Sequence, residues 1–213
     1  MAEIVLIINA LITLLVTIDP PGLVPIFLRL TYGMTGVERR ATAITAAIIS
    51  FFILTAFALA GETILNGLGI SIGAFQIAGG ILLFVIAFEM IFEKRSERKE
   101  QSAQIAITKD HIRNIAAFPL ALPMISGPGA ISATILMASK NTGFSGSIVS
   151  CIVILGAVLA CYGFMMLAHP IDRILGETGR TIVTRLFGVL LAALAVQFVA
   201  NGVIAIFLSP VSS

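Results

Sequence analysis

The residues best placed to do chemistry in this chain stand at two interruptions of its apolar segments. The first, "TIDPPG" from Thr17 to Gly22, puts a carboxylate, two prolines and a glycine inside an apolar run. The second, "SGPG" from Ser126 to Gly129, repeats the proline and the glycines without the acid. A helix broken in this way exposes backbone N–H and C=O groups, and an intramembrane carboxylate is too costly to keep without a role. Asp19 is therefore expected to act on a substrate ammonium or on a coupled proton.

Each interruption predicts a discontinuous helix. Proline cannot donate a backbone hydrogen bond, and Asp19 before Pro20 is typical of an N-cap followed by proline at the first helical position. Gly127 before Pro128 takes the corresponding place in the second interruption. We expect the two breaks close together near mid-membrane, with non-helical backbone at Asp19–Gly22 and Ser126–Gly129. The expected half-helices are Ile4–Ile18, Pro20–Thr31, Ile115–Ile125 and Pro128–Ala138.

Two such breaks brought together would form a small cavity with two poles. Free N–H groups at the start of each second half-helix favour an anion, and free carbonyls at the end of each first half-helix favour a cation. This arrangement suits a zwitterion, with Asp19 strengthening the cation-favouring side. The alternative is that Asp19 only caps its helix and that the breaks are architectural kinks. The predicted substrate-binding residues are Asp19, Pro20, Pro21, Gly22, Ser126, Gly127, Pro128, Gly129, Gln197 and Asn201, although an interhelical hydrogen bond explains Asn201 equally well.

The elements that must hold these residues are membrane-spanning helices. Of the 213 residues, 58% are hydrophobic and 11% are charged, and the mean hydropathy is +1.08. A soluble domain is about half apolar and about a quarter charged, so this composition excludes an ordinary water-soluble globule. A helix needs about 20 apolar residues to cross a bilayer. Six stretches qualify: Ile4–Thr31, Thr42–Leu65, Ile70–Phe92, Ile115–Ala138, Ile148–Ala168 and Leu186–Leu208.

Charge and internal similarity predict how these spans are arranged. Twelve of the 13 lysines and arginines fall in the first, third and fifth connections, and the opposite face has only Lys140, which predicts six spans with both termini outside. A shift of 108 residues aligns "GILLFVIAFEMI" with "GVLLAALAVQFV" and Pro20 with Pro128. Three spans per half force opposite orientations. We therefore predict an all-α membrane protein of two inverted three-helix repeats, residues 1–92 and 114–213, joined by a cytoplasmic linker at residues 93–113.

At "DPPGLVPIFLRLT" and "SGPGAIS" the sequence resembles the MarC family of six-span membrane proteins of bacteria and archaea, over essentially the whole chain. The resemblance implies a multi-pass protein of the prokaryotic inner membrane that transports small neutral amino acids such as alanine and glycine. By position, Asp19–Gly22 match the first family motif and Gly127–Gly129 match the second. Many members have Asn-Pro in place of Asp19-Pro20, so a proton relay through this carboxylate is not a shared family mechanism.

We expect a secondary transporter that cycles by alternating access. The chain contains no P-loop for ATP drive and no HExxH, GxSxG or paired intramembrane aspartates, so an intramembrane enzyme is not expected. A channel, an exporter of other small metabolites or drugs, and a non-transporting scaffold remain alternatives. The expected partners are the lipid bilayer, a small neutral amino acid and coupled H⁺ or Na⁺. No cofactor, metal or nucleic acid is expected, and a homo-oligomer is left open.

Overall fold

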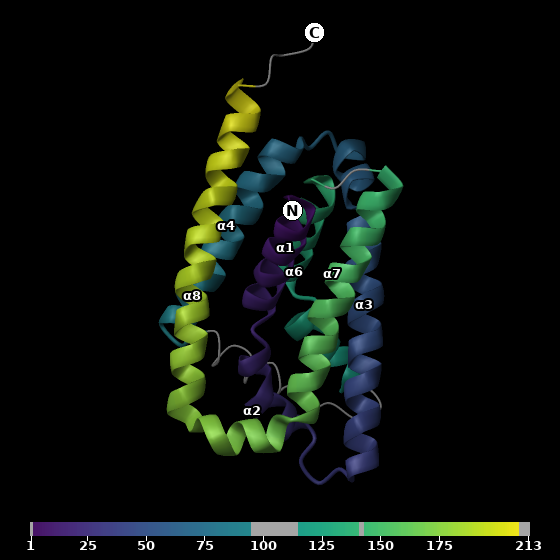
Figure 1. Cartoon of the computed structure of the whole chain (residues 1–213), viewed down its shortest axis with the longest axis vertical. Helices are drawn as coiled ribbons and strands as arrows, with labels where there is room; N and C mark the ends of the chain where they lie inside the picture. Colours follow the sequence, from purple (N-terminus) through teal and green to yellow (C-terminus); the bar gives the residue numbers. More distant parts are fainter. Residues whose placement is uncertain (1, 95–114, 141–142, 209–213) are drawn as a thin grey trace.

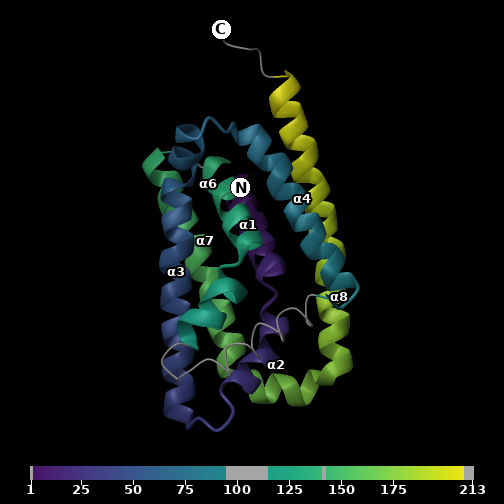
Figure 2. The same ribbon diagram turned by 180° about the vertical axis from the view of Figure 1, so that it is seen from behind.

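The computed structural model describes residues 2–94, 115–140 and 143–208, and helices make up nearly all of these ranges, with no strand among them. The all-helical prediction is confirmed, whereas the predicted linker lies almost wholly outside the described residues. Figures 1 and 2 show the helices standing roughly side by side along the long axis of the molecule. The elements are α1 (Ala2–Ile18), α2 (Pro20–Leu30), α3 (Gly36–Gly67), α4 (Ile72–Ile91), η1 (Ala116–Ile125), α6 (Pro128–Lys140), α7 (Gly143–Met166) and α8 (Ala168–Leu208).

Six spans result when each bent helix pair is counted once. By length and hydropathy, α3, α4, α7 and α8 can each cross a membrane. The pair α1 and α2 is bent by 41°, and the pair η1 and α6 is bent by 59°. Each pair continues from one end of the bundle toward the other instead of turning back, and α1 begins at the end where α8 finishes (Figure 1).

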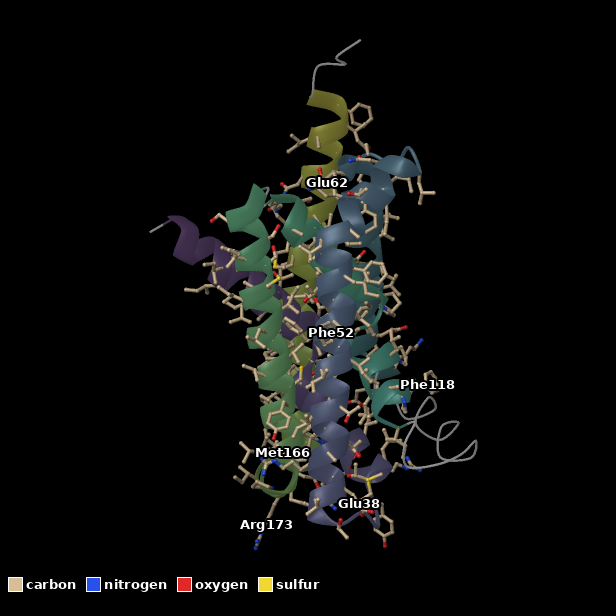
Figure 3. All side chains as sticks on the ribbon, turned by 90° about the vertical axis from the view of Figure 1, so that its right-hand side faces the viewer. Glu38, Phe52, Glu62, Phe118, Met166 and Arg173 are labelled. Atoms are coloured by element: carbon tan, nitrogen blue, oxygen red, sulfur yellow. The ribbon has the colours of Figure 1, made fainter. Side chains whose placement is uncertain are left out.

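The surface of the bundle is apolar along its length and charged at its ends. Large apolar side chains face outward from α3, α4, α7 and α8, among them Phe52, 67% exposed. Contact with lipid is favourable for such a surface, whereas contact with water is unfavourable. Figure 3 shows Glu38 and Arg173 at one end of the bundle and Glu62 at the other. The protein is therefore an integral membrane protein whose helix faces meet hydrocarbon.

Glycines bring α4 and α8 into backbone contact. A Cβ on Gly202 would lie 2.6 Å from the main-chain oxygen of Gly73, and a Cβ on Gly80 would lie 2.8 Å from that of Ala195. At the other end of the pair, a Cβ on Gly188 would lie 3.1 Å from the main-chain oxygen of Ala87. Small residues of this kind let membrane helices approach closely. We call these contacts, made by Gly73, Gly80, Gly188 and Gly202, the glycine contact.

The helix pairing matches what an inverted repeat would produce. The helices α4 and α8 pack against each other, as do α3 and α7, and these are pairs that the repeat makes equivalent. The first and fourth spans, which the repeat also makes equivalent, meet where α1 packs against α6. The glycine contact shows the same relation. Gly80 of α4 packs against Ala195 of α8, and their repeat equivalents 108 positions away, Gly188 of α8 and Ala87 of α4, also pack against each other. The helices α2 and α6 begin at Pro20 and Pro128, which are also 108 positions apart. The repeat itself stays a prediction, supported by this reciprocity.

The connection between the fifth and sixth spans is helical, so the predicted loop there is wrong. Helix α8 begins at Ala168 and bends sharply at Gly176, which has φ 58°. Its first part lies across the end of the bundle before the chain turns along the long axis (Figure 1). Ile171, Ile174 and Leu175 recur at helical spacing and supply the apolar face that such a helix needs. The glycine at the bend adopts a positive φ, a conformation that other residues rarely adopt.

Candidate functional site

The first break is a single residue, Asp19. Its backbone is left-handed, with φ 61° and ψ 69°, and its side chain is buried at 2% exposure. The N–H of Gly22 donates to Oδ1 of Asp19 at 3.2 Å, which confirms the predicted N-cap. The prediction of non-helical backbone was wrong for Pro20–Gly22, because Pro20 and Pro21 already form the first turn of α2. The fixed φ of proline suits that turn, where its missing N–H has no helical partner to lose.

Gly22 is required by the close approach of the capping carboxylate. A Cβ at this position would lie 2.1 Å from Oδ2 of Asp19 and 2.8 Å from its Cγ. The carboxylate therefore folds tightly over the first turn of α2. In this position it lies against the N-terminal N–H groups of α2, where the helix dipole favours negative charge.

A hydroxyl from the far end of the chain also contacts this carboxylate. Thr184 of α8 donates from Oγ1 toward Oδ1 of Asp19 at 3.3 Å, and its distance to Oδ2 is 3.5 Å. The next residue, Arg185, donates to Oε1 of Glu93 at 2.8 Å, just beyond the end of α4. Sequence reasoning missed Thr184, because a partner 165 residues away leaves no local pattern.

The second break follows a wide helical segment instead of the predicted α-half-helix at Ile115–Ile125. In η1 the backbone bonds span five residues, as in Ser126 N–H to the oxygen of Ala121 at 2.8 Å. Phe118 and Leu122 have extended dihedral angles inside it, and each precedes a proline. Proline disfavours the α conformation in the residue before it and supplies no N–H. Pro119 and Pro123 were not singled out from the sequence, although their four-residue spacing was visible there.

Ser126 and Gly127 make up the second break. Helix α6 begins at Pro128 as predicted, so the prediction of non-helical backbone was wrong for Pro128 and Gly129. The fully buried Ser126 hydroxyl donates to the main-chain oxygen of Ser50 in α3 at 3.3 Å. A Cβ on Gly127 would lie 2.5 Å from the main-chain oxygen of Pro123, so only glycine fits there without a backbone shift. Gly127 has no side chain to cap α6.

The two breaks lie in contact, as predicted. A Cβ on Gly129 would lie 3.2 Å from Cγ2 of Thr17, which is two residues before Asp19. The same Cβ would lie 2.4 Å from Cδ1 of Ile86 in α4. The end of α1 and the first turn of α6 therefore pack directly together, with α4 against them.

Gln197 and Asn201 lie elsewhere, in a cavity of about 380 Å³ between α1, α6 and α8. Gln197 donates from Nε2 to Oδ1 of Asn201 at 2.9 Å, so the hydrogen bond that the structure gives Asn201 lies within α8 instead of between helices. None of the residues at either break lines the cavity. The lining residues are Asn9, Ala10, Ile12, Thr13, Ala133, Leu136, Met137, Lys140, Leu194, Gln197, Phe198 and Asn201.

A polar row on α1 leads from this cavity to the breaks. The Thr13 hydroxyl donates to the main-chain oxygen of Asn9 at 2.8 Å, and Thr17 donates to that of Thr13 at 2.7 Å. Asn9 and Thr13 line the cavity, whereas Thr17 meets Gly129. Their spacing of four residues places them on one helix face, a pattern that the sequence contained and that our sequence reasoning missed.

No cluster of His, Cys, Asp and Glu suited to a metal ion occurs in the part of the chain that the structure describes. Cys151 and Cys161 are not joined by a disulfide bond. The groups that the arrangement offers for binding are a buried carboxylate, the N-terminus of α6, and a cavity with amide, hydroxyl and ammonium groups.

The fold and the site define a polytopic integral membrane protein with two broken spans that meet inside the bundle. The chain belongs to the MarC family, since the family described as "MarC family integral membrane protein" matches residues 4–207. It is 37% identical over 196 residues to the UPF0056 membrane protein YhcE of Escherichia coli K12, which covers 92% of this chain and 91% of that protein. It is 34% identical over 201 residues to the UPF0056 membrane protein YvbG of Bacillus subtilis 168, covering 94% and 95%. A UPF0056 membrane protein of Archaeoglobus fulgidus is 38% identical over 195 residues, covering 89% and 88%. No solved structure matches the chain.

Proposed function

We propose that this protein is a secondary transporter that carries a small neutral amino acid across the membrane by alternating access. The observation that carries the proposal is the contact between the two helix breaks, Thr17 against Gly129. Irregular backbone at membrane depth is tolerated where it is buried in protein or lines a wet cavity, and many transporters bind substrate at such breaks. The amino-acid class rests on the resemblance of the two proline motifs to the MarC family.

The breaks offer complementary groups for a zwitterion. Asp19 supplies a negative charge for an ammonium group, and its carboxylate is held in place by Gly22 and Thr184. The start of α6 supplies backbone N–H groups and a positive dipole end for a carboxylate. Transport would require the ammonium to compete with Thr184 for Asp19, because both use the same two oxygens.

Uptake of labelled L-alanine into proteoliposomes, with and without a pH gradient, tests the proposal. We expect saturable uptake by the wild-type protein and counter-transport of unlabelled alanine. In Asp19→Asn the apparent affinity should weaken by on the order of tenfold, the effect of losing a charge-assisted hydrogen bond. If Asp19 also carries the coupled proton, accumulation driven by the pH gradient should disappear in this variant while exchange persists.

The same assay separates the alternatives. A channel would show weak saturation and no counter-transport, and a scaffold would move nothing. An exporter of other metabolites or drugs would leave alanine uptake at background while moving its own substrate. Wild-type affinity and wild-type pH dependence in a well-folded Asp19→Asn protein would reduce this residue to a helix cap. No catalysed reaction is part of the proposal.

We further propose that the protein lies in the inner membrane with its basic end in the cytoplasm and both termini outside. Arg29 and Lys94 lie near helix ends on the basic side, and Arg185 of α8 joins them there through its ion pair with Glu93. Lys140 ends α6 on the opposite side. Thiols placed at Gly36 and Gly67 test this, because they mark the two ends of α3 and an added Cβ meets nothing within 4 Å at either position. A membrane-impermeant reagent added outside should label Gly67→Cys and miss Gly36→Cys. The reverse pattern would overturn the orientation.

A further inference from the structure

We propose that the cavity between α1, α6 and α8 is a vestibule that binds the carboxylate of a small amphipathic acid at Lys140. The proposal deepens the proposed function and rests on it for the identity of that acid as an amino acid. It adds a binding site on the side of the breaks where α1 begins and α8 ends. The site is formed by side chains that lie apart from both proline motifs.

Charge in the cavity favours an anion. Among the described residues that line it, Lys140 is the one that carries a charge. Its Nζ lies 5.4 Å from the centre of the Phe198 ring, a cation–π contact that holds the ammonium at the wall of the cavity. None of the carboxylates that the structure describes forms an ion pair with it. An ammonium held against a ring and not neutralised is available to a carboxylate from outside the chain.

Neutral hydrogen-bonding groups surround this charge. Gln197 donates to Oδ1 of Asn201, which leaves the Asn201 amide N–H groups to donate to a ligand and the Gln197 oxygen to accept. Both residues are one helical turn or less from Phe198, so they share the wall of the cavity with Lys140. A carboxylate bound by Lys140 and Asn201 would place an ammonium or hydroxyl group of the same molecule within reach of Gln197.

The size and the rest of the lining define the class of ligand. The remaining wall is mainly aliphatic, from Ala10, Ile12, Ala133, Leu136, Met137 and Leu194. A volume of about 380 Å³ compares with roughly 30 Å³ for a water molecule in the liquid, so the cavity holds a small acid together with several waters. Such a site binds loosely, as a vestibule does, and tolerates short apolar side chains.

Two helices join the wall of the cavity to the breaks. On α1, Thr13 lines the cavity and Thr17, one turn further, touches Gly129. On α6, Ala133 lines the cavity one turn after Gly129. The site at Lys140 is therefore formed in part by the same two helices that form the breaks.

Thiol labelling tests the site without relying on transport. In Asn201→Cys, an anionic thiosulfonate should react faster than a cationic one by on the order of tenfold, because a nearby positive charge attracts the first and repels the second. Adding Lys140→Met should remove this preference, and Lys140→Arg should keep it. Lys94→Met is the matched control, since it removes a lysine at the opposite end of the bundle and should leave the preference unchanged. The chain without the Asn201→Cys change gives the background from Cys151 and Cys161.

Protection by propionate completes the test. Propionate has a carboxylate and no ammonium, and it should slow labelling of Asn201→Cys when Lys140 is present but not in Lys140→Met. Absence of both the anionic preference and the protection would overturn the site. Labelling that phosphatidylglycerol in the vesicles slows by itself, with no further protection by propionate, would overturn it as well, because a lipid headgroup would then be the occupant.

The outcomes also separate this site from the proposed function. If the wild-type protein moves no neutral amino acid but the labelling pattern is as expected, the transporter proposal fails and the carboxylate site stands. If alanine uptake is saturable but the labelling shows no charge preference, the vestibule fails and the transporter proposal stands.

Discussion

Substitutions of Asp19 should separate its cap and its backbone conformation from its charge. Asp19 accepts from Gly22 and has a left-handed backbone with φ 61°. Asparagine caps about as well as aspartate and adopts this conformation readily, so Asp19→Asn should change the free energy of unfolding by less than about 0.5 kcal/mol. Alanine loses the cap, about 1 kcal/mol, and the hydrogen bond from Thr184, about 1 kcal/mol, and it adopts the left-handed conformation less readily than aspartate, a further cost of about 1–2 kcal/mol. We therefore expect Asp19→Ala to cost about 3–4 kcal/mol.

Glycine gives the intermediate case that makes the series informative. Asp19→Gly has no conformational penalty and loses only a few tenths of a kcal/mol as a cap, but it also loses the hydrogen bond from Thr184, about 1 kcal/mol. The expected order of stability is wild type and Asn, then Gly, then Ala. Equilibrium unfolding in mixed detergent–SDS micelles measures it. An Asn variant as unstable as the Ala variant would refute the reasoning, because the charge itself would then be the stabilising feature.

Three further predictions concern other positions. Gly127→Ala should destabilise the protein by about 1–3 kcal/mol in the same equilibrium unfolding assay, because its Cβ would meet a backbone carbonyl of η1 at 2.5 Å. Gly163→Ala in α7 is the control: a Cβ there meets nothing within 4 Å, so this variant should be neutral or stabilising. Gly22→Ala should displace the capping carboxylate of the first break and cost about 1 kcal/mol, with faster amide exchange in the first turn of α2 as the readout. At the start of α3, hydrogen bonds from Thr35 lower the pKa of Glu38 in the folded protein. Because the pKa of Glu38 is lower in the folded than in the unfolded protein, this capping box stabilises the helix fully at pH values above the unfolded pKa and loses that effect as the pH falls through the folded pKa. Amide exchange at Thr35, measured as a function of pH, should show the loss. Exchange that stays constant relative to the intrinsic rate down to low pH would contradict it.

The spans and the breaks could be predicted because their causes are local. A run of about 20 apolar residues is visible without any knowledge of its neighbours. Proline removes an N–H donor wherever it stands, so Pro20 and Pro128 mark the starts of α2 and α6 from the sequence alone. The contact between the breaks was predicted from the internal alignment, which is a longer-range inference but still one made from the chain itself.

The remaining features depend on partners that no local pattern specifies. Thr184 contacts Asp19 because α8 packs beside the first span, and one threonine among many gives no indication of this. The cavity exists because α1, α6 and α8 do not fill the space between them, which is a property of their packing. For this reason Gln197 and Asn201 were expected at the breaks and lie in the cavity instead.

The glycine contact restricts how this bundle can deform. Where α4 and α8 meet backbone to backbone, no layer of side chains lies between them to yield, and close-packed backbones do not slide past one another by small steps. We therefore expect the two helices to move as one rigid unit. A change in the shape of the bundle would then take place at the contacts between this unit and the other helices. The pair meets the rest of the bundle where α8 packs against α1 and α2 and where α4 packs against α6, beside the cavity and at the bond between Thr184 and Asp19. One rotation of this unit away from α1 and α2 would widen the cavity and, in the same movement, release the buried carboxylate of Asp19 from Thr184.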